Sequence, residues 1–351
     1  MNLNLLTNYY LNQQVSGYVS KDQNQKKLNQ YLRLDLGENL LGCSPKVFSS
    51  LKNLNQKDLN YYADPSGEKL KNKIADVYSL NKSNVILANS SNEIIEYLPK
   101  MVLNPKEKAL IILPTFFRFI ESTLSAGGKI VYRKRIKKDL SDIKLIWLAN
   151  PNNPTGTVLY LDRIENILKK TKALVILDEA FYEYYDLTNK DSGVNLINQY
   201  PNLIVLRTLS KAYGLAGLRL GYALAHKKTI KLIERCQNTL LMTSSVVQKI
   251  ALTALEDQGW LKKTVNQTKK LRNQVLETVK KNPDLHLLGE SQTNIYLIKH
   301  KRKDIYQELK KRGILTADLR NEKGLEKQKY VRVTVGNEQD NKKLLKVIKS
   351  L

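Results

Sequence analysis

The sequence predicts an α/β protein with a large domain on a mainly parallel sheet, followed by a smaller α+β domain. The length of 351 residues exceeds that of one average domain. The middle of the chain alternates short apolar runs with amphipathic stretches, which is the pattern of βαβ units. From about Lys227 long helical patterns take over. We therefore expect an N-terminal arm and part of the small domain at 1–40, the large domain at 41–235 and the small domain at 236–351.

The expected strands of the large domain are apolar runs without strict alternation. Such runs are typical of strands that are buried on both faces of a sheet. We expect helices between them at Ile94–Leu103, Phe117–Ala126 and Leu161–Lys170, with Pro99 kinking or shortening the first. The strands are expected at Val85–Ala88, Ala109–Leu113, Leu145–Ala149, Leu174–Leu177, Leu203–Leu206 and Leu220–Leu224.

The C-terminal part mixes long helices with isolated strands. The last predicted element is a short closing helix. The elements before it are helices at Thr229–Leu241, Ser245–Leu255 and Leu261–Lys280, a strand at Asn294–Ile298, a helix at Asp304–Lys311 and a strand at Tyr330–Val335.

Composition excludes several classes of protein. No run of 18 apolar residues occurs, so no membrane span is expected. The N-terminus lacks the pattern of a secretory signal. Cys43 and Cys236 are far apart without metal-ligand spacing, and the chain has three histidines, so we expect neither a disulfide framework nor a metal site. A cytoplasmic setting follows from this cysteine usage.

The formal net charge of +25 admits two interpretations. One is a protein that binds nucleic acid or an anionic surface. The other is a solvated basic surface that steers anionic small molecules. The basic residues are spread along the chain in short clusters, and no nucleic-acid-binding motif accompanies them. We therefore expect the second and no nucleic-acid partner.

Candidate chemistry follows three of the predicted strands. The turn 150–156 reads NPNNPTG, residues 178–181 read DEAF, and residues 207–219 read RTLSKAYGLAGLR. Each feature alone is weak, because a loop lysine is usually solvated and an acid after a strand is often a helix cap. Ligands of parallel sheets bind beyond the carboxyl ends of the strands, so the three segments are expected to share one site.

Together these segments meet the needs of a Schiff-base cofactor. Lys211 would be its covalent anchor, and Asp178 would keep its pyridine nitrogen protonated. Glycines 214 and 217 would let the backbone fold Arg219 back toward the cofactor phosphate. The expected phosphate ligands are Thr208, Ser210 and Arg219, with Ser90, Ser91 and Asn92 at the start of a helix.

The chain resembles a known enzyme family on these motifs. With GENLLGCSP, YYADPSG, ANSSNEII and YVRVTVGN, they are similar to the fold-type-I, class I/II aminotransferases, and within them to the histidinol-phosphate aminotransferases. The resemblance covers nearly the whole chain. It implies a seven-stranded, mainly parallel sheet, pyridoxal 5'-phosphate and a homodimer with shared active sites. It also implies amino transfer between an amino acid or amino-alcohol phosphate, histidinol-phosphate-like or aromatic, and 2-oxoglutarate.

The resemblance gives further residues a role. Asn153 would bond the ring oxygen of the cofactor, Phe116 would stack on its ring, and Tyr62 would reach the cofactor phosphate of the neighbouring subunit. Arg332 would bind the substrate carboxylate. The alternatives are a core role for Phe116 and a surface role for Arg332. Two more residues, Tyr18 and Asn39, would lie near the substrate entrance or be structural.

Three positions depart from the family pattern. Phe181 stands where a tyrosine is usual, a change that leans toward the related threonine-phosphate decarboxylases. Ala317 replaces an arginine that helps to bind the substrate phosphate, and Arg320 is a candidate substitute. Leu40 replaces a common proline. The alternatives to an aminotransferase are thus a decarboxylase of an amino-acid phosphate and, in another class, a non-catalytic basic binding protein on the same scaffold.

Overall fold

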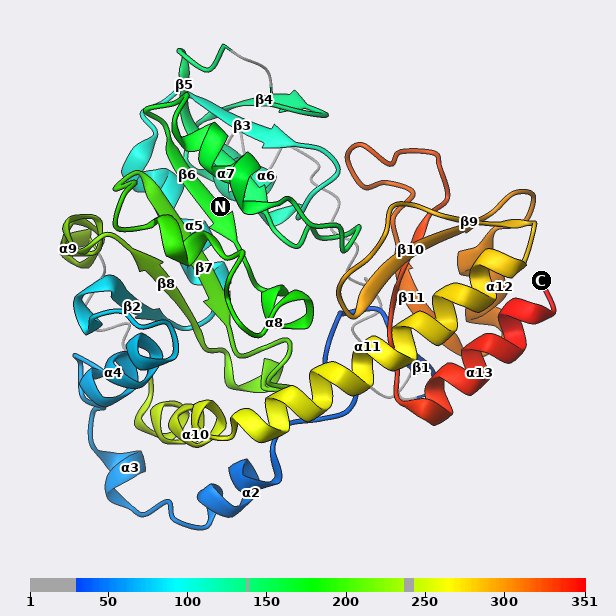
Figure 1. The fold of residues 1–351 in the computed structure, drawn as a ribbon, viewed down its shortest axis with the longest axis horizontal. Coiled ribbons are helices and arrows are strands. Elements are labelled where there is room, and N and C mark those ends of the chain that lie inside the picture. The colour runs from blue at the N-terminus through cyan, green and yellow to red at the C-terminus, as the bar shows by residue number, and fades with distance from the viewer. Residues whose placement is uncertain (1–29, 137–138, 237–242) are drawn as a thin grey trace, which may run out of the picture.

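The computed structural model describes residues 30–136, 139–236 and 243–351, which form two sheets joined by a long helix (Figure 1). The larger sheet has seven strands in the order β2-β8-β7-β6-β5-β3-β4. All neighbouring pairs from β7 to β4 are parallel, and only β8 runs against the others. Its strands are β2 (Val85–Ala88), β3 (Lys108–Ile112), β4 (Lys129–Arg133), β5 (Ile143–Ala149), β6 (Leu174–Asp178), β7 (Leu203–Thr208) and β8 (Gly221–Ala225).

The smaller sheet has five strands in the order β1-β11-β12-β10-β9. Its N-terminal strand pairs in parallel with β11, so the start of the described chain belongs to this sheet. The strands are β1 (Leu32–Leu34), β9 (Leu285–Leu287), β10 (Ile295–His300), β11 (Ile314–Asp318) and β12 (Val331–Thr334).

Helices cover both sheets, and α11 crosses from one part of the molecule to the other (Figure 1). Those of the first half are α2 (Pro45–Leu51), α3 (Lys57–Asn60), α4 (Glu68–Val77), α5 (Ser91–Val102), α6 (Arg118–Ser125), α7 (Leu161–Leu168) and α8 (Tyr182–Tyr185). Those of the second half are α9 (Lys227–Cys236), α10 (Ser245–Glu256), α11 (Gln258–Lys281), α12 (Ile305–Lys311) and α13 (Glu338–Lys349). Short 3-10 turns occur at Lys82–Asn84, Gly193–Leu196 and Ala216–Leu218.

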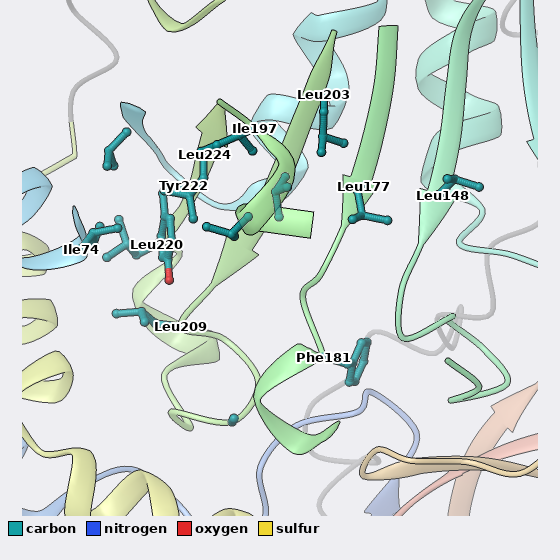
Figure 2. Close-up of a cluster of buried hydrophobic side chains, with 14 of the residues drawn as sticks. Ile74, Leu148, Leu177, Phe181, Ile197, Leu203, Leu209, Leu220, Tyr222 and Leu224 are labelled. Atoms are coloured by element: carbon teal, nitrogen blue, oxygen red, sulfur yellow. The ribbon is translucent and has the colours of Figure 1, made fainter. Parts of the chain in front are cut away.

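The central strands are apolar because both of their faces are buried. Every residue of β2, β7 and β8 is buried. On one face Leu148, Leu177 and Leu203 lie on three neighbouring strands of one core cluster (Figure 2). On the other face Trp147 stacks on Phe119 of α6 with ring centroids 4.6 Å apart. Helices on the two faces therefore hold the strand ends in fixed positions.

Most predicted elements are confirmed, with shifted ends. Helix α5 begins three residues before the expected start and continues through Pro99 to Val102. Part of the helix expected at Thr229–Leu241 lies outside the described residues. No helix that the structure describes is long and apolar enough to cross a membrane.

The packing of α10 differs from the predicted domain division at residue 236. Ile250, Ala251 and Leu255 of α10 lie in the core of the seven-stranded sheet, as do Leu261 and Val265 at the start of α11. The second half of α11 packs in the core of the smaller sheet. We therefore propose a domain boundary within α11.

Candidate active site

The three predicted segments meet in one cavity of about 490 Å³ at the carboxyl ends of β5, β6 and β7. This is the arrangement expected of a parallel sheet, where strands of one direction deliver their following loops to one edge. Asp178 and Lys211 both line it. Its other polar lining residues are Glu38, Ser90, Ser91, Asn92, Arg118, Asn153, Thr208, Ser210, Arg219 and Arg332.

Asp178 is the last residue of β6 and is buried between the neighbouring strands. Burial raises its pKa to about 6, whereas the Ala180 N–H group, 2.9 Å from Oδ1, and the charge of Lys211 lower it. A carboxylate with one hydrogen bond in such a place is stabilised by a nearby cation. A protonated pyridine nitrogen would be such a cation.

Lys211 lies in the loop after β7 and points its amine into the cavity. The ammonium Nζ donates a hydrogen bond to the carbonyl oxygen of Leu36 at 3.1 Å and lies 4.9 Å from the ring centroid of Phe181. Burial, together with the charge of the Arg332 guanidinium, lowers its pKa to about 8. A larger share of the amine is therefore neutral, and so nucleophilic, at neutral pH than for an exposed lysine.

The predicted phosphate ligands form a cup on one side of the cavity. Arg219 Nη2 donates to Ser90 Oγ at 2.8 Å, and Ser90 caps α5 by accepting from the Asn92 N–H group at 3.0 Å. Thr208 Oγ1 lies 3.0 Å from Ser210 Oγ. Hydroxyl groups, a guanidinium and the amide end of a helix are the donors that a phosphate dianion needs.

Close packing of the backbone holds this cup in place. A Cβ atom at Gly221 would lie 2.1 Å from the Ser91 nitrogen, so only glycine lets β8 support the start of α5. Gly214 has a φ of +71°, and its Cβ atom would meet the Gly42 carbonyl oxygen at 2.5 Å. Gly217 meets nothing within 4 Å and has no positive φ, so the role expected for it is not supported. The turn is made instead by Arg219 itself, which has a φ of +54°.

The substrate side of the cavity contains an arginine and an amide that contact each other. Arg332 of β12 is 2% exposed, and its Nη1 donates to Asn153 Oδ1 at 2.7 Å. Its Nη2 donates to the carbonyl oxygen of Asp35. The surface role that was the alternative for Arg332 is therefore wrong. Phe116 lines the cavity and also packs edge-on against Phe117 and Phe119.

Two predicted residues that the structure describes are not part of the cavity. Asn39 is buried and donates to the Ala212 carbonyl oxygen at 2.8 Å and to Thr264 Oγ1 at 3.1 Å, which gives it a structural role beside Lys211. Tyr62 is 93% exposed. Tyr18 lies outside the described residues.

The candidate substitute for the missing arginine also points elsewhere. Arg320 does not line the cavity; its guanidinium pairs with Asp318 at 2.7 Å and with Asp304 at 3.2 Å. Ala317 is the cross-strand partner of Arg332 and is almost fully buried. An arginine at position 317 would thus share a sheet face with Arg332.

Sequence reasoning did not assign a role to Arg118. It lines the cavity, donates from Nη1 to Glu121 Oε2 at 2.6 Å and from Nη2 to Glu96 Oε2 at 3.4 Å, and has a buried Nε without a partner among the described residues. An arginine after Pro114-Thr115-Phe116, beside the expected cofactor ring, is the signal that could have found it.

Sequence reasoning also missed the role of Arg207, next to Thr208. Its fully buried guanidinium pairs with Glu179 at 2.6 Å and with Glu183 at 3.0 Å, and it lies over the ring of Tyr182. This network joins the end of β7 to the segment after Asp178, so it keeps two strand ends of the site together.

These groups fit pyridoxal 5'-phosphate. The cavity offers an amine, a buried carboxylate and a cup of phosphate donors, and Gly221 brings that cup close to the sheet. Fold and site thus define a pyridoxal-phosphate-dependent enzyme.

Comparison with known proteins gives the family. "Aminotransferase class I and II" matches residues 29–348, so the chain belongs to this family of pyridoxal-phosphate-dependent transaminases. It is 34% identical over 349 residues to a histidinol-phosphate aminotransferase of Macrococcus caseolyticus, covering 95% of each chain. It is also 34% identical over 334 residues to one of Thermoanaerobacter pseudethanolicus, covering 91% of this chain and 92% of the relative.

Solved structures agree with this result. The histidinol-phosphate aminotransferase of Clostridium acetobutylicum superposes with a TM-score of 0.82 at 25% identity, covering 91% of this chain and 98% of that one. The enzyme of Sinorhizobium meliloti, solved with pyridoxal 5'-phosphate, gives 0.81 at 22% identity, with 95% and 96% covered. A threonine-phosphate decarboxylase of Porphyromonas gingivalis shares the fold at 0.79 and 19% identity, with 91% and 98% covered. The family match and the curated relatives, rather than the shared fold, identify the chain as an enzyme and not as a non-catalytic binding protein.

Proposed function

We propose that this aminotransferase moves the amino group of a histidinol-phosphate-like or aromatic donor to 2-oxoglutarate. The observation that carries the proposal is the single cavity that holds Lys211, Asp178 and Arg332. The names of the most similar relatives support the choice of donor.

Three residues of the chain have separate roles in the proposed reaction. When bound, pyridoxal phosphate supplies an aromatic ring that accepts the electron pair released at the substrate α-carbon. Asp178 holds the proton of the pyridine nitrogen in place. Lys211 Nζ would anchor the cofactor, and as a free amine it would take the α-proton of the substrate and return it. Arg332 binds a carboxylate, which orients the α-carbon toward Lys211.

We propose a homodimer in which Tyr62 acts in the neighbouring subunit. Tyr62 is 93% exposed and does not line the cavity of its own subunit. Phe48, Leu59 and Tyr61 are exposed in the same part of the chain. An exposed group of apolar side chains is typical of a protein interface.

A decarboxylase is the second candidate, because two observations favour it. Phe181 is buried at the cavity where the family usually has tyrosine, and the threonine-phosphate decarboxylase fold is among the similar structures. In a decarboxylase the bond to the carboxylate, in place of the bond to the α-proton, stands perpendicular to the cofactor ring.

Product analysis separates the two candidates. The holoenzyme is incubated with histidinol phosphate or an aromatic amino acid in the presence of 2-oxoglutarate. Glutamate formation is the expected result; carbon dioxide release from an amino-acid phosphate without glutamate would support the decarboxylase. Lys211→Ala should lose both the lysine-linked chromophore and turnover, and full activity of that variant would contradict the assigned site.

A further inference from the structure

A third buried arginine, besides Arg207 and Arg332, lies outside the active-site lining and has no acidic partner among the described residues. Arg272 of α11 is 4% exposed, and its Nε and Nη2 both donate to Asn273 Oδ1, at 3.2 and 3.1 Å. No salt bridge joins it to any other residue in the described part of the chain. Burial lowers its pKa, and no neighbouring acid offsets that effect. Arg207, equally buried, has two carboxylates around it.

Buried charges in proteins are normally paired, because removing an ion from water costs several kcal/mol. An arginine without a protein carboxylate is therefore suited to an anion from solution. A planar guanidinium binds phosphate or carboxylate through two parallel hydrogen bonds.

The space for such an anion is a cavity of about 570 Å³ between the second half of α11, β9 and the loop that follows β9. Lys280, His286, Ser291 and Gln292 line it together with Arg272, and Glu290 is the one acid in its lining. Its lining shares no residue with that of the active-site cavity. The site is thus separate and carries an excess of positive groups.

We propose that this cavity binds a small-molecule phosphate, with the phosphoryl group on Arg272. The ammonium of Lys280 and the imidazole of His286, beside the guanidinium, suit the terminal oxygens of a phosphate monoester. Leu276 and Leu287 give the cavity apolar walls for the organic part of the molecule. The cavity is larger than inorganic phosphate alone would require.

The loop that closes this cavity also contacts the active site. The Gln292 N–H group donates to the Gly156 carbonyl oxygen at 2.9 Å, and a Cβ atom at Gly156 would lie 2.1 Å from Ser291 Oγ. The turn that contains Gly156 also holds Asn153, which accepts from Arg332. A ligand on Arg272 is therefore placed to change substrate affinity through this loop.

Calorimetric titration of the holoenzyme tests the site. In the holoenzyme the cofactor phosphate fills the Ser90 cup, so inorganic phosphate and glycerol 3-phosphate report on other sites. Saturable binding is expected, and Arg272→Met should weaken it about ten- to a hundredfold, the usual effect of losing hydrogen bonds to a charged group. Lys270→Gln removes the same charge from an exposed position of α11 and should bind as the wild type does.

Three results would overturn the proposal: no saturable binding, equal binding by Arg272→Met, or loss of binding in Arg332→Gln alone, which would place the phosphate in the substrate cavity. Thermal unfolding without phosphate checks that Arg272→Met folds; because it removes an unpaired buried charge, its melting temperature should not fall. If phosphate binds without changing KM or kcat, the binding site is supported but the coupling through Gln292 is contradicted.

Discussion

At the residue scale, neighbouring groups shift the pKa of the Lys211 amine in opposite directions. Lys211 must be neutral to attack the cofactor aldehyde, yet its acidic neighbours favour the charged ammonium. Burial and the charge of Arg332 both favour the neutral amine, while Glu38 and Asp178 favour the ammonium. Burial is the largest of these effects, so the amine reacts near neutral pH.

The pH dependence of cofactor loading follows from this balance. The ordinary pKa of lysine is 10.5, and that of Lys211 is about 8. The rate at which apoenzyme gains the lysine-linked chromophore should rise about tenfold per pH unit below 8 and level off above it. Stopped-flow absorbance over a pH series measures this rate. Arg332→Gln should move the midpoint upward, and a wild-type midpoint near 10.5 would contradict the proposed environment.

Of the residues considered as ligands of a substrate phosphate, Arg118 is the one whose surroundings best suit that role. Ala317 cannot bind an anion and Arg320 is held by Asp304 and Asp318, whereas Arg118 Nε faces a buried place without an acceptor. Glu96 and Glu121 orient its guanidinium and offset part of its charge.

Arg118→Met is therefore expected to raise KM for a phosphorylated donor about tenfold, in line with the loss of one hydrogen bond to a charged group. The KM for a donor without phosphate should change little. Steady-state kinetics with both donors measures the difference. Arg320→Met is the matched control and should leave both values near the wild type; the reverse pattern would restore Arg320 as the phosphate ligand.

At the scale of elements, burial decides what the sequence could predict. Strands β2, β6 and β7 are buried on both faces, as is β5 after its exposed Lys144, so each gives an apolar run of at least four residues, and their predicted ends fall within two residues. Edge strand β4 has only exposed and half-buried residues and charged residues at both ends, and β1 and β9 have three residues each. The sequence patterns of such short or polar strands do not differ from those of loops, and none of these three strands was predicted.

In the active site, too, the sequence could predict residues in local motifs but not residues whose roles depend on other segments. Lys211, Asp178 and Arg219 sit in local motifs whose spacing predicts their place in the cavity. The roles of Arg118 and Arg207 depend on carboxylates from other segments, so no local pattern could show them.

The contact between β8 and α5 gives a prediction at this scale. Gly221→Ala should push the backbone of Ser90 and Ser91 outward, because its Cβ atom would lie 2.1 Å from the Ser91 nitrogen. We expect cofactor affinity to fall about tenfold or more, as phosphate hydrogen bonds are lost. Fluorescence titration of apoenzyme with pyridoxal phosphate measures it. Gly217→Ala, which adds a Cβ atom in open space, is the control; equal affinities of the two variants would contradict the packing argument.

At the scale of the whole molecule, an exposed region of large apolar side chains is the expected contact surface for a second copy of the chain. Tyr62 is 93% exposed and Leu59 is 76% exposed, beside α3 at the lower edge of the molecule (Figure 1). A Tyr62 hydroxyl on a cofactor phosphate would add one hydrogen bond to a charged group, about 1.5–3 kcal/mol. Tyr62→Phe should therefore weaken cofactor binding although the residue lies outside its own cavity.

Mixing two defective variants tests whether this residue crosses between subunits. Lys211→Ala alone should be inactive, and Tyr62→Phe alone should be mostly without cofactor at a concentration below its weakened dissociation constant. In a mixed dimer, one site combines the intact Lys211 of one subunit with the intact Tyr62 of the other. Activity at limiting cofactor should then exceed that of either parent, approaching one restored site per mixed dimer. If Tyr62 served its own subunit, each site would keep one defect and mixing would restore nothing.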